Sequence, residues 1–199
     1  MADISIDEIK RIRELTGVGI TDAKQALVEA NGDFDKALEA MRKKGLTKAE
    51  KRGEREARAG IIGSYVHDNR IGVLVEVNCE TDFVARNDLF KELVKDLTLH
   101  IAASAPMFVS VEDIPADIRD KAKDEFSERV KADGKPEKMI HGIVEGMLKK
   151  HFAEKCLLDQ PFVKNPDQTV GDFVKEYIAK LGENIVVRRF NRMQLGEVA

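Results

Sequence analysis

Hydrophobic residues recur at every third or fourth position in three short runs over the first 44 residues. This spacing places them on one face of a helix, so the sequence predicts three amphipathic helices. The runs are separated by Thr16-Gly17-Val18-Gly19 and by Asn31-Gly32, where glycines permit tight turns. Thr21 is the expected N-cap of the second helix, and Gly45 is expected to follow the end of the third. Residues 1–44 are therefore expected to form a compact three-helix unit.

The next segment, residues 45–59, is charged and carries few hydrophobic residues. Five basic and three acidic side chains give it a net charge of +2. We interpret it as a solvated, partly helical linker between the N-terminal unit and a core formed by residues 60–199. An alternative is a basic stripe from Lys48 to Arg58 that binds RNA phosphates, but the interleaved glutamates cancel most of its field.

A β-hairpin is predicted after the linker. Residues 61–67 and 71–77 are rich in β-branched side chains and flank Asp68-Asn69-Arg70, where Asp and Asn tolerate turn geometry. Alternate positions of the second strand point to the same face, which carries Val73, Val75 and Val77. Residues 185–190 are expected to form a last strand that joins this sheet.

The rest of the chain predicts helices. One helix covers residues 89–101 and ends before Pro106, and another runs from Thr169 to Gly182. Between them, residues 117–156 are typical of a helical hairpin, with a narrow hydrophobic stripe opposite a wider one. The expected fold class is therefore α+β. It combines an N-terminal three-helix bundle, a linker, and a core in which helices pack a small three-stranded antiparallel sheet and a helical hairpin projects as an arm.

Composition excludes several classes of protein. Charged residues make up 35% of the 199 residues, but the net charge of −3 does not suit binding of nucleic acid by bulk charge. No run approaches the ~18–20 uninterrupted apolar residues of a membrane span. The two cysteines, Cys79 and Cys156, lie far apart, and the N-terminus lacks the pattern of a signal peptide. We therefore expect a cytoplasmic protein that binds neither membranes nor nucleic acid directly.

Motifs for catalysis, metal binding or nucleotide binding are missing from the sequence. The four histidines have no spacing typical of a metal site, and no CxxC or glycine-rich phosphate loop occurs. A nucleophile at Cys79 with a distant histidine as its base stays open as an alternative, although no nucleophile elbow surrounds this cysteine. We expect no enzyme activity, no cofactor and no metal.

The segment between the hairpin and the helix at 89–101 is the most informative, and it contains Thr81, Asp82, Phe83 and Val84. Two interpretations stay open from the residues alone. In the first, a polar residue (Thr81, Asp82 or Asp88) caps the following helix, and Phe83 or Val84 packs beneath it as a hydrophobic staple. In the second, Asp82 and Phe83 project from a loop on a rigid scaffold and insert into a pocket of a partner.

Two long motifs resemble those of the elongation factor Ts family. Residues 76–86, with Thr81-Asp82-Phe83-Val84 inside them, are similar to the Thr-Asp-Phe-Val motif of that family. Residues 12–27 resemble its N-terminal motif, with a minor apolar exchange at Ile12, where the family usually has Leu. The resemblance spans nearly the whole chain, and shorter stretches that fit are Gln160-Pro161-Phe162-Val163 and Gly182-Glu183-Asn184-Ile185.

The resemblance implies a function, which is guanine-nucleotide exchange on elongation factor Tu during translation elongation. It implies that residues 1–44 are a UBA-like domain that docks on the G domain of Tu. The candidate contacts are Arg13, Thr16, Gly17, Val18, Gly19 and Ile20, which without the resemblance are simply part of a helix–helix turn. It also implies that Asp82 and Phe83, flanked by Thr81 and Val84, intrude into the G domain, disturb its Mg²⁺ and phosphate site, and promote release of GDP.

The resemblance also bears on assembly. Longer family members carry two related core subdomains, whereas residues 60–199 hold one predicted sheet and one arm. Short members can pair their cores, so a homodimer that binds two Tu molecules is expected here. The alternative function is a UBA-type adaptor that recognises a protein through its three-helix unit, and such an adaptor has no use for the Asp82-Phe83 loop.

Overall fold

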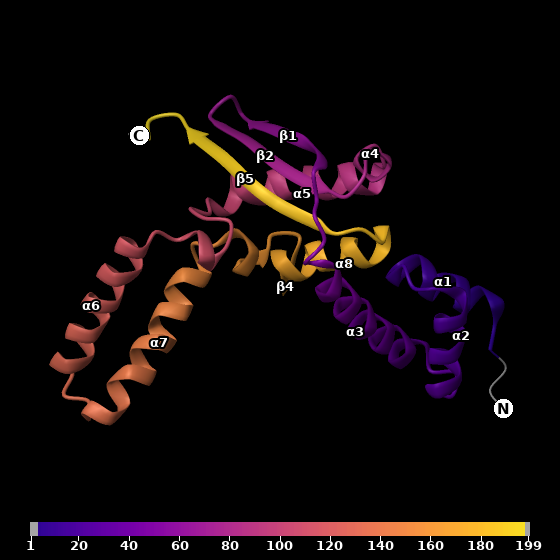
Figure 1. Ribbon diagram of the computed structural model, residues 1–199, viewed down its shortest axis with the longest axis horizontal. Coiled ribbons are helices and arrows are strands. Elements are labelled where there is room, and N and C mark those ends of the chain that lie inside the picture. Colours follow the sequence, from indigo (N-terminus) through magenta and orange to yellow (C-terminus); the bar gives the residue numbers. More distant parts are fainter. Residues whose placement is uncertain (1–3, 198–199) are drawn as a thin grey trace.

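The computed structural model describes residues 4–197; within the third helix, the side chains of Leu46 and Lys48 are not described. The Lys48 end of the predicted basic stripe therefore lies outside the described side chains. Figure 1 shows an elongated molecule with the N-terminal helices at one end, a sheet above helices in the middle, and a two-helix arm at the other end. The mixture of helices with a three-stranded antiparallel sheet confirms the α+β class.

The N-terminal unit consists of three helices: α1 (Ile6–Thr16), α2 (Ile20–Glu29) and α3 (Phe34–Arg52). Ser5 starts α1 with a capping box, in which its hydroxyl oxygen accepts hydrogen bonds from two backbone N–H groups of the first turn. The predicted N-cap Thr21 is wrong, because α2 already begins at Ile20. A separate small core joins the three helices: Ile9, Ile12, Val18, Ala23, Ala26, Leu27, Ala37 and Met41.

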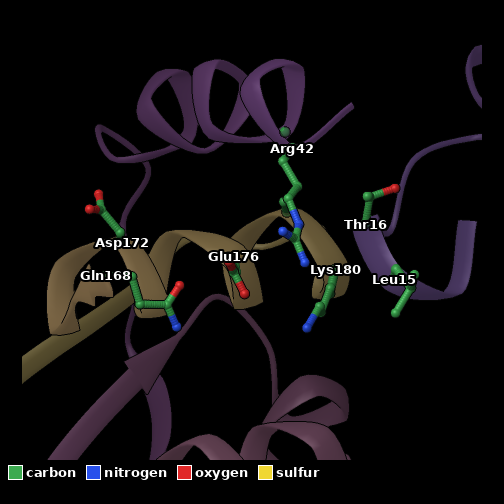
Figure 2. A pocket seen from close by; sticks show the side chains of 9 residues that line it. Leu15, Thr16, Arg42, Gln168, Asp172, Glu176 and Lys180 are labelled. Atoms are coloured by element: carbon green, nitrogen blue, oxygen red, sulfur yellow. The ribbon is translucent and has the colours of Figure 1, made fainter. Parts of the chain in front are cut away.

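The predicted end of the third helix is wrong, because α3 continues through Gly45 to Arg52. A glycine inside a helix costs only about 1 kcal/mol relative to alanine. Here the missing side chain lets α3 approach α8 (Val170–Leu181), since a Cβ at Gly45 would lie 3.3 Å from the Cβ of Ala179. Residues 45–52 are thus helical, and a pocket opens beside this contact (Figure 2).

The main sheet has the strand order β1-β2-β5 and is antiparallel throughout. Its strands are β1 (Ala59–His67), β2 (Ile71–Cys79) and β5 (Ile185–Gln194). The predicted hairpin and the predicted last strand are confirmed. Asp68 and Asn69 have φ values of 47° and 55°, the left-handed region that these residue types tolerate. The inward face carries the expected valines, each at most 3% exposed: Val73, Val75 and Val77.

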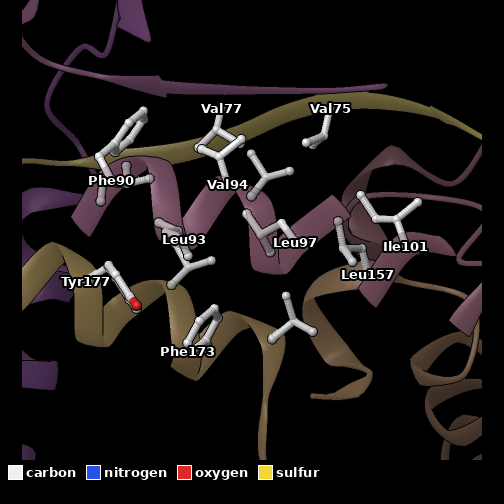
Figure 3. Packing of buried hydrophobic residues seen from close by; sticks show 14 of the residues in the cluster. Val75, Val77, Phe90, Leu93, Val94, Leu97, Ile101, Leu157, Phe173 and Tyr177 are labelled. Carbon is white, nitrogen blue, oxygen red and sulfur yellow. The ribbon is translucent and has the colours of Figure 1, made fainter. Parts of the chain in front are cut away.

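Two of the predicted helices cover one face of this sheet. Helix α5 (Asp88–Ser104) lies between the strands and α8, so the core has three layers (Figure 3). In Figure 3, Val75 and Val77 meet α5 from the sheet side, and Phe173 and Tyr177 of α8 meet it from the opposite side. The other face of the sheet has no helix over it in Figure 1.

A second, small sheet was not predicted. It pairs β3 (Pro161–Phe162) with β4 (Asn165–Thr169). Residues 165–169 are polar and turn-forming, with no alternation that would indicate a strand. The pairing is instead fixed by tertiary packing, because the Phe162 ring stacks on Phe173 with centroids 4.1 Å apart.

The predicted helical hairpin is confirmed as an arm that projects from the core in Figure 1. It consists of α6 (Ala116–Ala132) and α7 (Glu137–Ala153). Its base has a hydrophobic cluster of its own, formed by Ile114, Ala122, Phe152 and Cys156. Within residues 4–197, no helix combines the length and the apolar character needed to cross a membrane.

Candidate partner-binding site

The predicted segment at residues 81–84 forms a single helical turn, α4 (Asp82–Ala85), between β2 and α5. Thr81 is its N-cap, and the hydroxyl oxygen accepts a hydrogen bond from the Val84 N–H at 3.4 Å. Ala85 is buried in the main core and Val84 is half-buried against it. The turn therefore rests on the core through its C-terminal half, while Asp82 and Phe83 are exposed.

Phe83 is the residue that distinguishes the two interpretations of this segment. Its side chain is 89% exposed, more than any other large hydrophobic side chain described within residues 4–197. Phe83 therefore does not pack beneath the next helix, and of the two hydrophobic residues it is Val84 that packs against the core. The predicted caps of the long helix are wrong, because α5 is capped by Asn87. Thr81 instead caps the separate turn α4. An aromatic ring kept out of the core on a fixed backbone has the geometry of an interface anchor.

Sequence reasoning missed Glu183, which lies in the turn between α8 and β5. Its carboxylate accepts hydrogen bonds from the backbone N–H groups of Glu80 and Thr81 and from the Thr81 hydroxyl. Glu183 and Thr81 are 102 positions apart, so no local motif could indicate this contact. The loop before α4 is thus held by a side chain from the far end of the chain.

Cys79 supports this loop and does not have the environment of a nucleophile. Its side chain is fully buried, and its thiol donates to the carbonyl oxygen of Thr81 at 3.2 Å. Burial, with a smaller contribution from the negative charge of Glu183, raises the pKa of the Cys79 thiol to about 11. A reactive cysteine needs a lowered pKa and access to substrate. The alternative of a catalytic Cys79 therefore has no support in the geometry.

The N-terminal candidates divide into exposed and buried residues. The exposed ones are Arg13, Gly17, Gly19 and Ile20, and the buried ones are Thr16 and Val18. Ile20 is 56% exposed, so a hydrophobic side chain is available at the start of α2. The Thr16 hydroxyl instead donates to the carbonyl oxygen of Ile12 at 2.6 Å, inside the protein. Of the six candidates, the two buried side chains are not available at this surface.

The two candidate regions lie toward the same end of the molecule. In Figure 1, α4 and the N-terminal helices both lie on the side of the core away from the arm, and the N-terminal helices extend to the end of the long axis.

A pocket of about 200 Å³ adjoins the N-terminal candidate loop (Figure 2). It is lined by Leu15 and Thr16 of α1, Arg42 of α3, and Glu176 and Lys180 of α8, among others. Because side chains of both charge signs line it, the pocket has no marked preference for an anion or a cation. Across the described residues 4–197, no group of three or more His, Cys, Asp or Glu side chains is placed to hold a metal ion.

Comparison with known proteins shows to which family the chain belongs. A sequence model of the family described as "Elongation factor TS" matches residues 12–177. The chain belongs to the elongation factor Ts family. The resemblance drawn from the motifs is thereby confirmed, and both the N-terminal motif and the Thr81–Val84 segment lie inside the matched range.

Relatives over nearly the full chain agree with this membership. The Elongation factor Ts of Fervidobacterium nodosum is 52% identical over 196 residues, which cover 98% of this chain and 100% of that protein. The Elongation factor Ts of Thermodesulfovibrio yellowstonii is 49% identical over 194 residues, which cover 98% of this chain and 97% of that protein. The Elongation factor Ts of Geobacter sulfurreducens is 49% identical over 195 residues, which cover 98% of this chain and 90% of that protein.

Proposed function

We propose that this protein is a guanine-nucleotide exchange factor for elongation factor Tu and acts in translation elongation in the cytoplasm. Its membership of the elongation factor Ts family supports this function. The observation that carries the proposal is Phe83, whose side chain is 89% exposed on a helical turn fixed to the core. The protein acts by binding, so none of its side chains is given a catalytic role.

The mechanism follows from how a G domain holds GDP. Backbone N–H groups of a phosphate loop and a Mg²⁺ ion bind the phosphates. Asp82 and Phe83 enter the G domain of Tu close to these groups and favour an arrangement in which the phosphate and Mg²⁺ contacts are lost. Since coupling between two ligands is reciprocal, the factor weakens GDP binding as much as GDP weakens binding of the factor.

One side chain does not supply enough energy for this mechanism. Raising the rate of GDP release ten-thousandfold requires roughly 5.5 kcal/mol of transition-state stabilisation. Burying one Phe side chain contributes about 1.5–3 kcal/mol. A second contact region must therefore supply binding energy, and the N-terminal helices lie toward the same end of the molecule as α4.

The N-terminal unit is proposed to be the UBA-like docking domain, with the chain divided into residues 1–44, a connection at 45–59, and the core at 60–199. Its three short helices around a small core support this assignment. Arg13 and Ile20 are the exposed side chains best suited to contact the G domain. Thr16 and Val18 are proposed to shape the loop from inside.

A homodimer that binds two Tu molecules is proposed through the outer face of the main sheet. This face carries exposed hydrophobic side chains from all three strands, namely Ile62, Val66, Leu74 and Met193. An ion pair between Glu76 and Arg189, 2.8 Å apart, lies on the same face. A second copy presents the same apolar surface, so two-fold pairing would cover both faces at once.

The experiment that tests the exchange function measures release of fluorescent GDP from elongation factor Tu with and without the protein. Phe83→Ala is expected to slow the accelerated release about 10- to 100-fold, because the burial energy of one Phe side chain corresponds to that factor. The free energy of unfolding of Phe83→Ala should change by less than about 0.5 kcal/mol, because the exposed ring makes no core contact.

Met139→Ala is the matched control, because Met139 is also a hydrophobic side chain and is 56% exposed, but on the arm. It should leave GDP release unchanged. If the wild-type protein does not accelerate release at micromolar concentration, the exchange function is wrong. Binding to a different protein through the N-terminal helices, without effect on GDP release, would favour the UBA-type adaptor.

A further inference from the structure

The short helix that carries Phe83 is not sufficient to fix the position of this residue. Helix α4 has four residues, which is far too short to be stable by itself in water. The Phe83 side chain is exposed, so core packing does not orient it either. After Phe83, the backbone is held by Val84 and Ala85, which pack on the core. Before Phe83, it is held by contacts made just ahead of the helix.

Glu183 makes these contacts. One carboxylate oxygen, Oε2, accepts the backbone N–H groups of Glu80 at 3.1 Å and Thr81 at 3.0 Å. The other, Oε1, accepts the Thr81 hydroxyl at 2.6 Å. The same hydroxyl caps α4 by accepting the Val84 N–H. One charged side chain thus holds both the backbone and the capping group of the residue that starts the helix, and hydrogen bonds to charged groups are the stronger class.

A reciprocal contact ties the same turn to the end of α3. Glu80 Oε1 accepts the backbone N–H of Asn184 at 2.6 Å and lies 3.6 Å from the guanidinium of Arg55. The side-chain amide of Asn184, which is 2% exposed, donates to the carbonyl oxygens of Gly53 at 3.3 Å and Arg55 at 2.6 Å. Glu183 and Asn184 therefore join the loop before α4 to the segment that leads back to the N-terminal helices.

We propose that Glu183 is a positioning residue for nucleotide exchange, and that the Glu80–Asn184 contacts set the position of Phe83 relative to the N-terminal helices. This inference rests on the proposed exchange function. A ring held in its bound position before the encounter loses less conformational freedom on binding, so more of its burial energy remains for displacing GDP. The adjacent Glu183–Asn184 turn thus links the two regions that must contact Tu together.

The test measures the maximal rate of GDP release from Tu and the factor concentration that gives half of it. Glu183→Ala is expected to lower the maximal rate about tenfold, with a smaller change in the half-maximal concentration, because the ring acts in the transition state and the N-terminal contacts remain. Glu183→Gln should restore much of the rate, since its amide oxygen still accepts the two backbone N–H groups. Glu125→Ala, the same change on an exposed part of the arm, should have no effect.

The decisive comparison combines Glu183→Ala with Phe83→Ala. If Glu183 acts through Phe83, the double variant releases GDP at the rate of Phe83→Ala alone. If Glu183→Ala slows release by the same factor with and without Phe83, the positioning role is wrong. It is also wrong if Glu183→Ala keeps the wild-type rate.

Amide hydrogen exchange at Glu80 and Thr81 gives a readout that is independent of Tu. Both amides should exchange faster in Glu183→Ala and stay protected in Glu183→Gln; unchanged protection in the alanine variant would contradict the contacts. If Glu183→Ala does not fold, Glu183→Asp serves instead, because its shorter side chain cannot reach both the backbone and the hydroxyl. Failure of the proposed exchange function can be told apart from failure of the positioning role. In that case the wild-type protein does not accelerate GDP release, although the amides of Glu80 and Thr81 are still protected.

Discussion

The roles of individual residues in this protein depend on hydrogen bonds to residues far away in the sequence as well as on their own chemistry. His100, on α5, is fully buried and takes part in a complete hydrogen-bond network. Its Nδ1 accepts the backbone N–H of Val163 at 3.2 Å, so Nε2 carries the proton and donates to Gln160 Oε1 at 2.9 Å. Gln160 in turn donates to the carbonyl oxygens of Ser104 and Glu154, at the ends of α5 and α7. The neutral ring therefore joins the core to the base of the arm.

Stability is expected to depend on pH through His100. Burial lowers the pKa of His100, an effect that the hydrogen bond to Gln160 only partly opposes. The unfolded imidazole has a pKa near 6.5, so below about pH 6.5 the unfolded state binds more protons than the folded state. The contribution of the neutral His100 ring to the free energy of unfolding is fully present above about pH 6.5. It is lost as the pH falls from that value toward the lower pKa that His100 has in the folded protein. Urea unfolding at a series of pH values measures this loss.

Two variants separate His100 from other titrating groups. His100→Gln removes the buried imidazole and should make the free energy of unfolding less dependent on pH between about 5 and 7. His141→Gln makes the same exchange at an exposed position of α7, where the side chain is 77% exposed, and controls for the substitution itself. Equal pH dependence in wild type and His100→Gln would contradict the role given to His100.

At the scale of elements, close backbone contacts decide how the N-terminal helices sit on the core. The turn between α1 and α2 approaches α8 so closely that a Cβ at Gly17 would lie 2.4 Å from the Cα of Lys180. Gly17 also has φ 67°, where residues with a side chain are strained. Together with Gly45 and the buried Ala49, this contact makes the N-terminal unit continuous with the core.

Gly17→Ala should therefore destabilise the protein by about 1–3 kcal/mol, the cost of a strained backbone conformation to which a clash with α8 adds. Gly19→Ala is the matched control in the same turn, because no atom lies within 4 Å of the added Cβ and φ is −65°. Its cost should be about 0.5 kcal/mol, from a poorer helix start. Thermal or urea unfolding compares the two, and equal losses would contradict the close contact at Gly17.

For the whole molecule, the unpartnered outer face of the sheet predicts self-association. Light scattering should give a mass near twice 22.3 kDa at micromolar concentration. Leu74→Arg places a charge in the middle of this face and should yield a monomer, since burying an unpaired charge is costly. Met139→Arg, on the exposed arm, should remain a dimer. A wild-type mass near 22.3 kDa would overturn the dimer.

The sequence by itself determined what depends on neighbouring residues. Alternation at Val73, Val75 and Val77 predicted the strand and the face that these valines share, which the structure buries. The spacing of hydrophobic residues predicted the arm and the helix that begins after Thr169. The ordered motifs at residues 12–27 and 76–86 were sufficient to indicate the family. Periodicity, capping and turn preference act over a few residues, so they can be read along the chain.

Only the tertiary structure decided the features that depend on distant contacts. It carried α3 past Gly45 to Arg52, where the helix packs against α8. It left the Phe83 side chain 89% exposed, although a Phe before an amphipathic helix is equally consistent with packing beneath it. It brought Glu183 to Thr81 across 102 positions. The exposure of a side chain and its long-range hydrogen bonds depend on which elements pack together in the folded protein. Local sequence patterns do not show which elements pack together.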